Sequence, residues 1–207
     1  MFRLTALIIA MMAPLALAGN QKYEPRAASV QSQMQSTISD LATPFLAFDN
    51  VDEARAWLAA MSGKLERRMP DRRAREEFLV TVHYEAKRAG LDPQLVLGLI
   101  QVESGFHKYA VSSASARGYM QVMPFWVKQI GQPGHNLFHL RTNLRYGCVI
   151  LKHYLDIEQG DYFRALGRYN GSLGKAEYPN LVVRTWNSNW KYPAHPAAGG
   201  VRTSGPN

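Results

Sequence analysis

The chain has 207 residues, of which 46% are hydrophobic, 11% aromatic and 19% charged. This composition suits one globular domain with additional tails, and it excludes a wholly disordered chain and a collagen-like repeat. The formal net charge of +8 favours polyanionic partners, which include nucleic acid, an anionic membrane surface and an acidic polysaccharide.

Residues 1–18 are typical of a secretory signal peptide. Arg3 precedes an apolar run over residues 4–17, and Ala16-Leu17-Ala18 provides a small-x-small cleavage site. The run is shorter than the ~20 residues of a membrane-spanning helix. We expect cleavage near Ala18 and a periplasmic or secreted product without a transmembrane anchor. Loss of Arg3 lowers the 24 basic residues to 23 against 16 acidic ones, a net charge of +7, and export argues against a nucleic-acid partner.

An N-terminal extension over residues 19–75 is predicted to be partly helical. Its first part, residues 19–39, is rich in Gln, Ser and Ala, so we expect a mobile or loosely packed lead-in. Asn50 and Glu53 then form a start that resembles a capping box, and apolar residues recur at helical spacing as far as Leu65. The charged run 66–73, which proline interrupts, is interpreted as a linker.

The main domain is predicted to span residues 76–190. A helix over residues 75–89 precedes Asp92-Pro93, which supplies an N-cap and a first-turn proline for a buried central helix. Glu103 stands at the end of the apolar stripe of that helix, directly before Ser104-Gly105 ends it. Taken alone, such a glutamate is more often one that turns to water or pairs with an arginine than a functional acid.

The remainder of this domain is predicted to alternate tight loops with helices. Residues 106–124 contain many small side chains, which allow close approach of the backbone, and another helix is expected to begin at Pro124. Further helices are predicted over residues 143–158 and 161–170. The tail, residues 191–207, is rich in Pro, Gly and Ala and is predicted to be flexible.

Three short motifs occur in this order in the main domain: Glu103-Ser104-Gly105-Phe106, Gly118-Tyr119-Met120-Gln121-Val122-Met123-Pro124 and Tyr169-Asn170-Gly171. Their order and separations resemble those of the soluble-lytic-transglycosylase-type (SLT-type) catalytic domain, over about residues 91–190. The resemblance implies a mainly α, lysozyme-like fold related to goose-type lysozyme. It also implies cleavage of the bond between N-acetylmuramic acid and N-acetylglucosamine in peptidoglycan, whose glycan strands are then the expected partner.

The same resemblance implies roles for particular residues. Glu103 takes the catalytic acid/base position. Tyr169 matches an aromatic residue that faces the glutamate, and we expect its hydroxyl to point toward Glu103 or the acetamido group of the substrate. The residues matched to substrate binding are Ser112, Met120, Gln121, Tyr169 and Asn170.

The chain also departs from the family pattern. Tyr119 stands where Leu is common, and residues 113–116 replace a turn that usually contains proline. The segments 171–174 and 178–182 differ from the common family sequences, so the resemblance defines the far end of the groove less well than the catalytic end.

The residues themselves permit this chemistry. Cleavage of a glycosidic bond needs a proton donor, and a carboxyl serves near neutral pH only if burial raises its pKa. Ordinary glycosidases use two carboxylates, whereas residues 112–124 and 164–175 contain none. A single carboxyl suits substrate-assisted cleavage, in which Glu103 then acts as a base on the C6 hydroxyl and a 1,6-anhydro ring closes. The sequence permits that product, and the resemblance implies it.

Other patterns are weaker, and neither a metal site nor a cofactor is predicted. His135 and His139 stand four apart, but no glutamate follows His135 as in a zincin helix. Ser172 and Lys175 fit a Ser-x-x-Lys pattern whose companion motifs are missing. Cys148 is the single cysteine, which excludes an intrachain disulfide, and it is interpreted as a buried structural thiol. Three tryptophans suit either sugar stacking or packing, namely Trp126, Trp186 and Trp190.

Two other functions remain open at this point. One is a muramidase that hydrolyses the same bond with water, and the other is a non-catalytic wall-binding module. The presence of Glu103, Gln121 and Tyr169 together favours catalysis. The extension and the tail are candidates for contact with a cell-envelope or secretion machine, but nothing in them identifies one.

Overall fold

The computed structural model describes residues 21–26, 28–39 and 42–193. The predicted signal peptide and residues 194–207 of the predicted tail lie outside these ranges. Within them the chain is mainly helical, which confirms the expected fold class, and the only β-type pairing is two isolated bridges that join Arg117 to Val111 and Val122. No helix in this part of the chain is both long and apolar enough to cross a bilayer.

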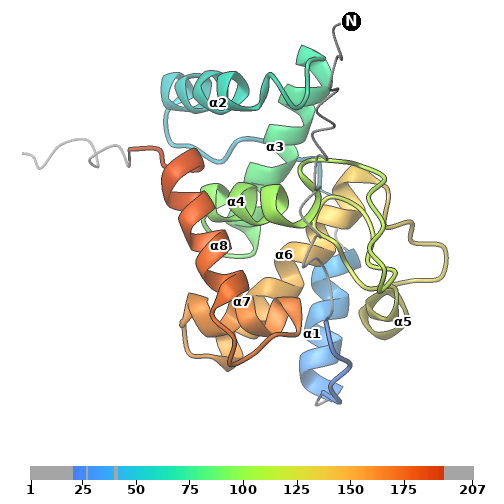
Figure 1. Cartoon of the computed structure of the whole chain (residues 1–207). Helices are drawn as coiled ribbons and strands as arrows, with labels where there is room; N and C mark the ends of the chain where they lie inside the picture. Colours follow the sequence, from blue (N-terminus) through green and yellow to red (C-terminus); the bar gives the residue numbers. More distant parts are fainter. Residues whose placement is uncertain (1–20, 27, 40–41, 194–207) are drawn as a thin grey trace, which may run out of the picture.

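The helices follow one another along the chain, and a long loop over residues 105–124 separates α4 from α5 (Figure 1). In chain order the described residues form α1 (Ala28–Ser39), α2 (Val51–Leu65), α3 (Arg72–Arg88), α4 (Pro93–Ser104), α5 (Phe125–Ile130), α6 (Leu140–Ile157), α7 (Tyr162–Asn170), α8 (Glu177–Thr185) and the short π-helix η1 (Trp186–Trp190).

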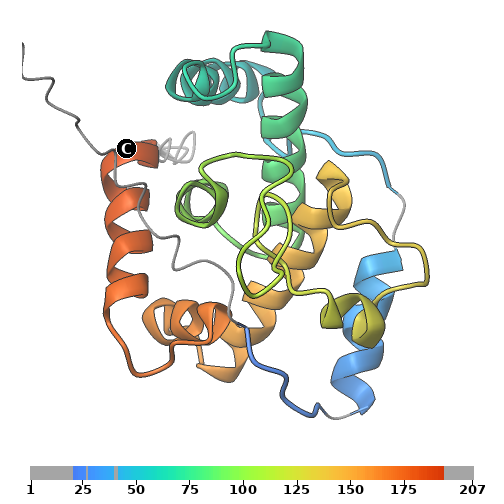
Figure 2. The same ribbon diagram turned by 45° about the vertical axis from the view of Figure 1, so that its right-hand side comes forward.

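Helix α4 is the buried central helix that the sequence predicts. Figure 2 views it nearly along its axis, with α3, α6, α7, α8 and the loop over residues 106–124 around it. The Asp92 side chain caps its first turn by accepting from the backbone N–H of Gln94, and Gly105, with φ of 57°, ends it. Gly98 lets η1 approach closely, because a Cβ there would lie 3.0 Å from the backbone of Trp186.

Residues 66–71 of the charged run connect α2 to α3, as the linker interpretation expects, but residues 72–73 already belong to α3. Asp71 caps α3, which begins at Arg72 and continues through the predicted domain boundary at residue 75. Arg75 is 5% exposed and donates hydrogen bonds to Ser62 Oγ at 2.7 Å and to the carbonyl oxygen of Met69 at 2.7 Å. This buried guanidinium joins α2 to α3, so the two helices form a packed hairpin.

The first part of the extension is also not a loose lead-in over its whole length. Residues 28–39 form α1, which buries Met34 and Ile38 against the rest of the core. Gln31 donates to the carbonyl oxygen of Gln129 at 2.6 Å, and Arg145 donates to that of Ile38 at 3.1 Å. The composition of α1 gives no strong helix signal, and these tertiary contacts supply the stability that propensity lacks.

Candidate active site

Glu103 occupies the last turn of α4 and is 2% exposed. The residues one and two turns before it on the same face are fully buried apolar side chains, Leu99, Ile100 and Val96. The apolar stripe of α4 therefore ends in a carboxyl group that is buried inside the protein rather than exposed to water.

The side chain that meets Glu103 is Tyr178, in the first turn of α8. Its hydroxyl donates a hydrogen bond to Glu103 Oε1, and Tyr178 is itself 2% exposed. Burial and the neighbouring charge of Glu103 hold the pKa of Tyr178 well above its ordinary value, so this hydroxyl keeps its proton and remains a donor. The sequence analysis placed Tyr178 only in a divergent segment and gave it no role.

Tyr169 lies in the last turn of α7 and is fully buried. Its hydroxyl donates to the carbonyl oxygen of Met120 at 2.7 Å, which differs from the expected direction toward Glu103 or a substrate. Burial first, and the charge of Glu103 second, raise the pKa of Tyr169 well above its ordinary value. Tyr169 is therefore close enough to Glu103 to be affected by its charge, while its hydrogen bond fixes the loop wall at Met120.

The loop between α4 and α5 is held by side chains that bond its own backbone. Gln121 has a positive φ of 48° and is 1% exposed, and its Nε2 donates to the carbonyl oxygens of Gly118 at 2.9 Å and Ala110 at 3.1 Å. Ser112 Oγ accepts from the N–H of Ala116 at 3.1 Å. Both residues shape this loop, and their contact with substrate stays a prediction.

Asn143 of α6 is a support that the sequence analysis missed. It is fully buried, its Oδ1 accepts from the N–H of Met120 at 2.8 Å, and its Nδ2 donates to the carbonyl oxygens of Arg117 and Leu137, both at 2.8 Å. Its close fit requires Gly118, where a Cβ would lie 2.4 Å from Asn143 Nδ2. One side chain thus fixes the loop wall to the long helix behind it.

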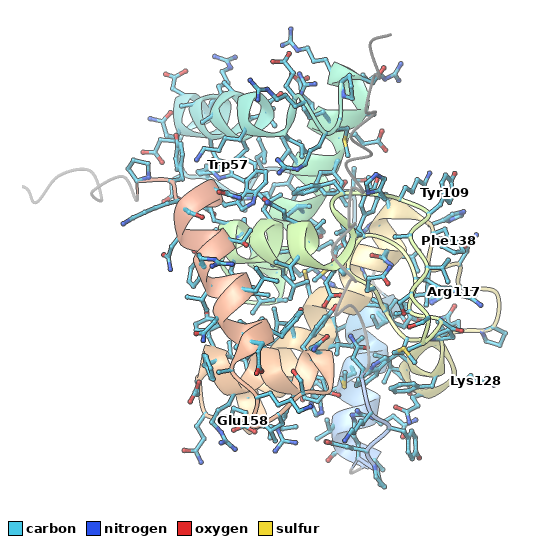
Figure 3. The ribbon with its side chains drawn as sticks, in the orientation of Figure 1. Trp57, Tyr109, Arg117, Lys128, Phe138 and Glu158 are labelled. Carbon is cyan, nitrogen blue, oxygen red and sulfur yellow. The ribbon has the colours of Figure 1, made fainter. Side chains whose placement is uncertain are left out.

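The outer edge of this loop carries one exposed ring, which packs near a ring of the connection between α5 and α6. Tyr109 is 70% exposed and its ring centroid lies 5.8 Å from that of Phe138 (Figure 3). Both rings lie on the side of the molecule opposite α8 (Figure 3).

Asn170 follows Tyr169 at the end of α7 and is 4% exposed. Its Nδ2 donates to Ser172 Oγ at 3.1 Å, whereas its Oδ1 has no hydrogen-bond partner among the described residues. A buried carbonyl oxygen of this kind is an available acceptor for an N–H group.

The N-terminal segment 21–26 packs against the same loop, which the sequence analysis did not foresee. Gln21 is 3% exposed, and its Oε1 accepts from Trp126 Nε1 at 2.9 Å and from the N–H of Met123 at 3.4 Å. The guanidinium of Arg26 lies 3.9 Å from the centroid of the Trp126 ring. Trp126 is fully buried, which excludes it from sugar stacking, and Trp190 is 1% exposed and also packs in the core.

The two histidines of the weaker sequence patterns have structural roles. His135 Nδ1 lies 2.8 Å from the Tyr146 hydroxyl, and the backbone of His139 caps α6. In the part of the chain that the structure describes, no three His, Cys, Asp or Glu side chains group as metal ligands. Cys148 is 1% exposed, and burial raises the pKa of its thiol well above the ordinary value, as suits a structural cysteine.

Known proteins match the part of the chain that contains Glu103 and its surroundings. Residues 81–181 match the family model described as the transglycosylase SLT domain. A transglycosylase of Enterobacteria phage PRD1 is 32% identical over 135 residues, which are 60% of this chain and 50% of that protein. The membrane-bound lytic murein transglycosylase C of Mannheimia succiniciproducens is 32% identical over 140 residues, 58% of this chain and 36% of that protein.

A solved structure of an inactive mutant of lytic transglycosylase Slt from Pseudomonas aeruginosa covers 66% of this chain and 23% of its own, with 24% identity and a TM-score of 0.44. The matched part of this chain spans half or less of the length of each of these three proteins. The matched family segment begins inside α3 and ends inside α8, so it contains both Glu103 and Tyr178.

Proposed function

Residues 81–181 form a transglycosylase SLT domain, and from this premise we propose that the chain is a peptidoglycan lytic transglycosylase. It cleaves the β-1,4 bond between N-acetylmuramic acid and N-acetylglucosamine and leaves 1,6-anhydro ends. The single observation that supports this most strongly is a buried carboxyl, Glu103, held by a tyrosine hydroxyl at the end of the central helix.

Glu103 performs both proton transfers in this proposal. An apolar wall disfavours the charged form of a carboxyl, which prepares Glu103 to protonate the leaving glycosidic oxygen as the bond from C1 breaks. The hydrogen bond from Tyr178 then stabilises the carboxylate that forms and keeps its orientation. The N-acetyl group of the substrate stabilises the cationic centre at C1.

The second half of the reaction returns the proton. Glu103 takes the proton of the C6 hydroxyl, and O6 forms a bond to C1 that closes the anhydro ring. No water is consumed, because the proton lost by O6 replaces the one given to the leaving oxygen. One carboxyl therefore suffices where most glycosidases need two.

The other predicted site residues are proposed to bind the substrate or to shape the wall of its site. Asn170 Oδ1, a buried acceptor without a partner in the described part of the chain, is proposed to accept the N–H of an acetamido group. Ser112 and Gln121 are proposed to contact the sugar from the loop, and Met120 to form the wall against which Tyr169 is fixed.

We also propose that residues 1–18 are a signal peptide cleaved near Ala18, so that the enzyme acts in the periplasm or outside the cell. Residues 76–190 would then be the catalytic domain, with residues 19–75 as its extension and 191–207 as a tail. Processing can be checked by N-terminal sequencing of the protein recovered from a periplasmic fraction.

The deciding experiment is digestion of purified peptidoglycan sacculi followed by mass spectrometry of the released muropeptides. We expect anhydro ends with the wild type and a turnover lower by about 10² to 10⁴ with the folded Glu103→Gln variant, because proton transfer is lost. Hydrated ends would identify a muramidase instead. Binding without release of either product would identify a wall-binding module.

A further inference from the structure

A cavity lies at the opposite end of α4 from Glu103. Its volume is about 560 Å³, within the range of small-molecule sites, and Asp92, Pro93 and Gln94 at the start of α4 form part of its wall. Since an α-helix rises 1.5 Å per residue, Glu103 lies about 15 Å from Pro93 along the helix axis. This cavity is therefore separate from the site at Glu103.

Aromatic rings make up much of the cavity wall. Phe48, Trp57 and Tyr192 line it, and Trp57 lies on the inner side of α2 (Figure 3). The Phe48 ring stacks on His83 with centroids 4.6 Å apart, and the Trp57 ring meets His83 edge-on at 4.8 Å. Phe48 and Trp57 fix the His83 ring. Trp57 is only 1% exposed, so the partly exposed rings of Phe48 and Tyr192 provide the apolar surface that faces the cavity.

His83 is the buried polar group of this wall. It is 1% exposed, and its Nδ1 has no hydrogen-bond partner among the described residues. Burial, aided by the charge of Lys87, lowers its pKa to about 4, so at neutral pH the ring is uncharged and offers one donor and one acceptor. A buried polar atom without a partner is costly in free energy, and a ligand or a water commonly satisfies it.

The charges at the cavity are nearly balanced. Glu53 and Asp92 contribute carboxylates, and Lys87 contributes one ammonium. Asp92 Oδ1 already accepts from the N–H of Gln94 at 2.7 Å. The two carboxylates would repel an anionic ligand, and the Lys87 ammonium would repel a cationic one. An uncharged ligand with several hydroxyl groups and an apolar face matches both the charges and the rings.

We propose that this cavity is a second glycan-binding site, which takes an N-acetylated amino-sugar unit of the peptidoglycan strand away from the cleavage site. The identity of the polymer rests on the proposed function, while the sugar chemistry rests on the cavity itself. A chain that holds one strand at two places gains avidity, because the second contact is intramolecular. The site would keep the enzyme on its polymer between cleavages.

The test uses the full-length Glu103→Gln protein, so that binding is measured without turnover. A short soluble β-1,4 oligomer of N-acetylglucosamine is titrated while the ring resonances of His83 are followed by NMR. We expect these resonances to shift on binding, and the double variant Glu53→Gln, Tyr192→Ala to bind about three- to tenfold more weakly at this site. The same variant is expected to be retained less on sedimented sacculi.

Matched controls separate the cavity from general surface effects. Asp52→Asn changes the neighbouring exposed acid of the same helical turn, and Phe163→Ala removes an exposed ring on α7. Both should bind like the parent protein. Unchanged His83 resonances on addition of the oligomer would overturn the proposal, and shifts caused by a free stem peptide but not by the oligomer would show that the ligand is not a sugar. Neither outcome depends on whether the protein cleaves glycan, which the muropeptide analysis decides independently.

Discussion

The hydroxyl of Tyr178 donates a hydrogen bond to Glu103 Oε1, and both side chains are 2% exposed. This contact joins the first turn of α8 to the last turn of α4. It places the donor next to the group that must change its charge twice in the proposed reaction. In the proposed reaction, Tyr178 is therefore a positioning residue for Glu103.

Removing that hydroxyl tests this role. Tyr178→Phe is expected to lower turnover about 10- to 100-fold, because a hydrogen bond to a charged group contributes about 1.5–3 kcal/mol. The ring and its packing remain, so the melting temperature should stay within a few degrees. Initial rates on sacculi and thermal unfolding measure the two effects. The control Tyr162→Phe removes a hydroxyl from α7 outside the site, and a Tyr178→Phe rate equal to that of the control would contradict the assignment.

Tyr169→Phe is expected to behave differently from Tyr178→Phe. The Tyr169 hydroxyl donates to the carbonyl oxygen of Met120, and its loss leaves a buried acceptor unpaired at a cost of about 1–3 kcal/mol of unfolding free energy. Urea unfolding should therefore show a clear loss of stability, and turnover should fall because the Met120 wall is no longer fixed. A variant as stable as the wild type would show that this bond does not hold the loop.

The local parts of the fold and site follow from sequence, and the long-range parts do not. Asp92 and Gly105 bound α4, and each is a cap signal local to its own end of the helix, so the position of Glu103 at the helix end is predictable. Its partner Tyr178 lies 75 residues away, in a helix that contains Pro179 and whose N-cap, Ala176, makes no side-chain hydrogen bond. Local periodicity carries no information about such a pair.

The expectation of a loose lead-in over residues 19–39 was wrong in part, because the structure of this segment, too, depends on contacts between residues far apart in the sequence. Residues 28–39 lack a strong apolar stripe, and α1 is held by partners about a hundred residues away, such as the Gln129 carbonyl. The family resemblance predicts substrate-binding residues in the loop over residues 112–121, but the hydrogen-bond partner of Tyr169 depends on where the Met120 backbone comes to lie. Neither fact can be obtained from spacing alone.

A buried histidine, His83, and a half-buried one, His153, predict a pH dependence of stability. The pKa values of His83 and His153 are both lowered from 6.5 to about 4, chiefly by burial, with Lys87 adding to the effect at His83 and Arg26 at His153. Because the folded state binds these protons more weakly than the unfolded state, their contribution is fully present above pH 6.5 and is lost as the pH falls toward 4. Each should cost about 1–3 kcal/mol over that range, with partial solvent contact reducing the effect.

Urea unfolding at pH 7.5, 5.5 and 4.5 measures this loss of stability. His153 Nε2 accepts from Arg26 Nε at 3.2 Å, a bond that protonation would break. A His153→Gln variant keeps a polar side chain that does not titrate, and its stability should therefore fall less steeply with decreasing pH than that of the wild type. Equal slopes for the two proteins would exclude His153 as a source of the pH dependence.

The last prediction concerns Gln21, whose Oε1 accepts from Trp126 Nε1 and from the N–H of Met123. Trp126 is fully buried, so Gln21→Ala leaves its indole N–H without this acceptor, at a cost of about 1–3 kcal/mol of unfolding free energy. The Trp126 indole N–H resonance should shift, and turnover should fall because Met123 belongs to the loop that carries Met120. Lys22→Ala, which removes the exposed neighbouring side chain, is the control for any general effect of changing this segment. If Gln21→Ala matched Lys22→Ala in stability, resonance position and rate, the N-terminal segment would be a passive neighbour of the loop rather than part of its support.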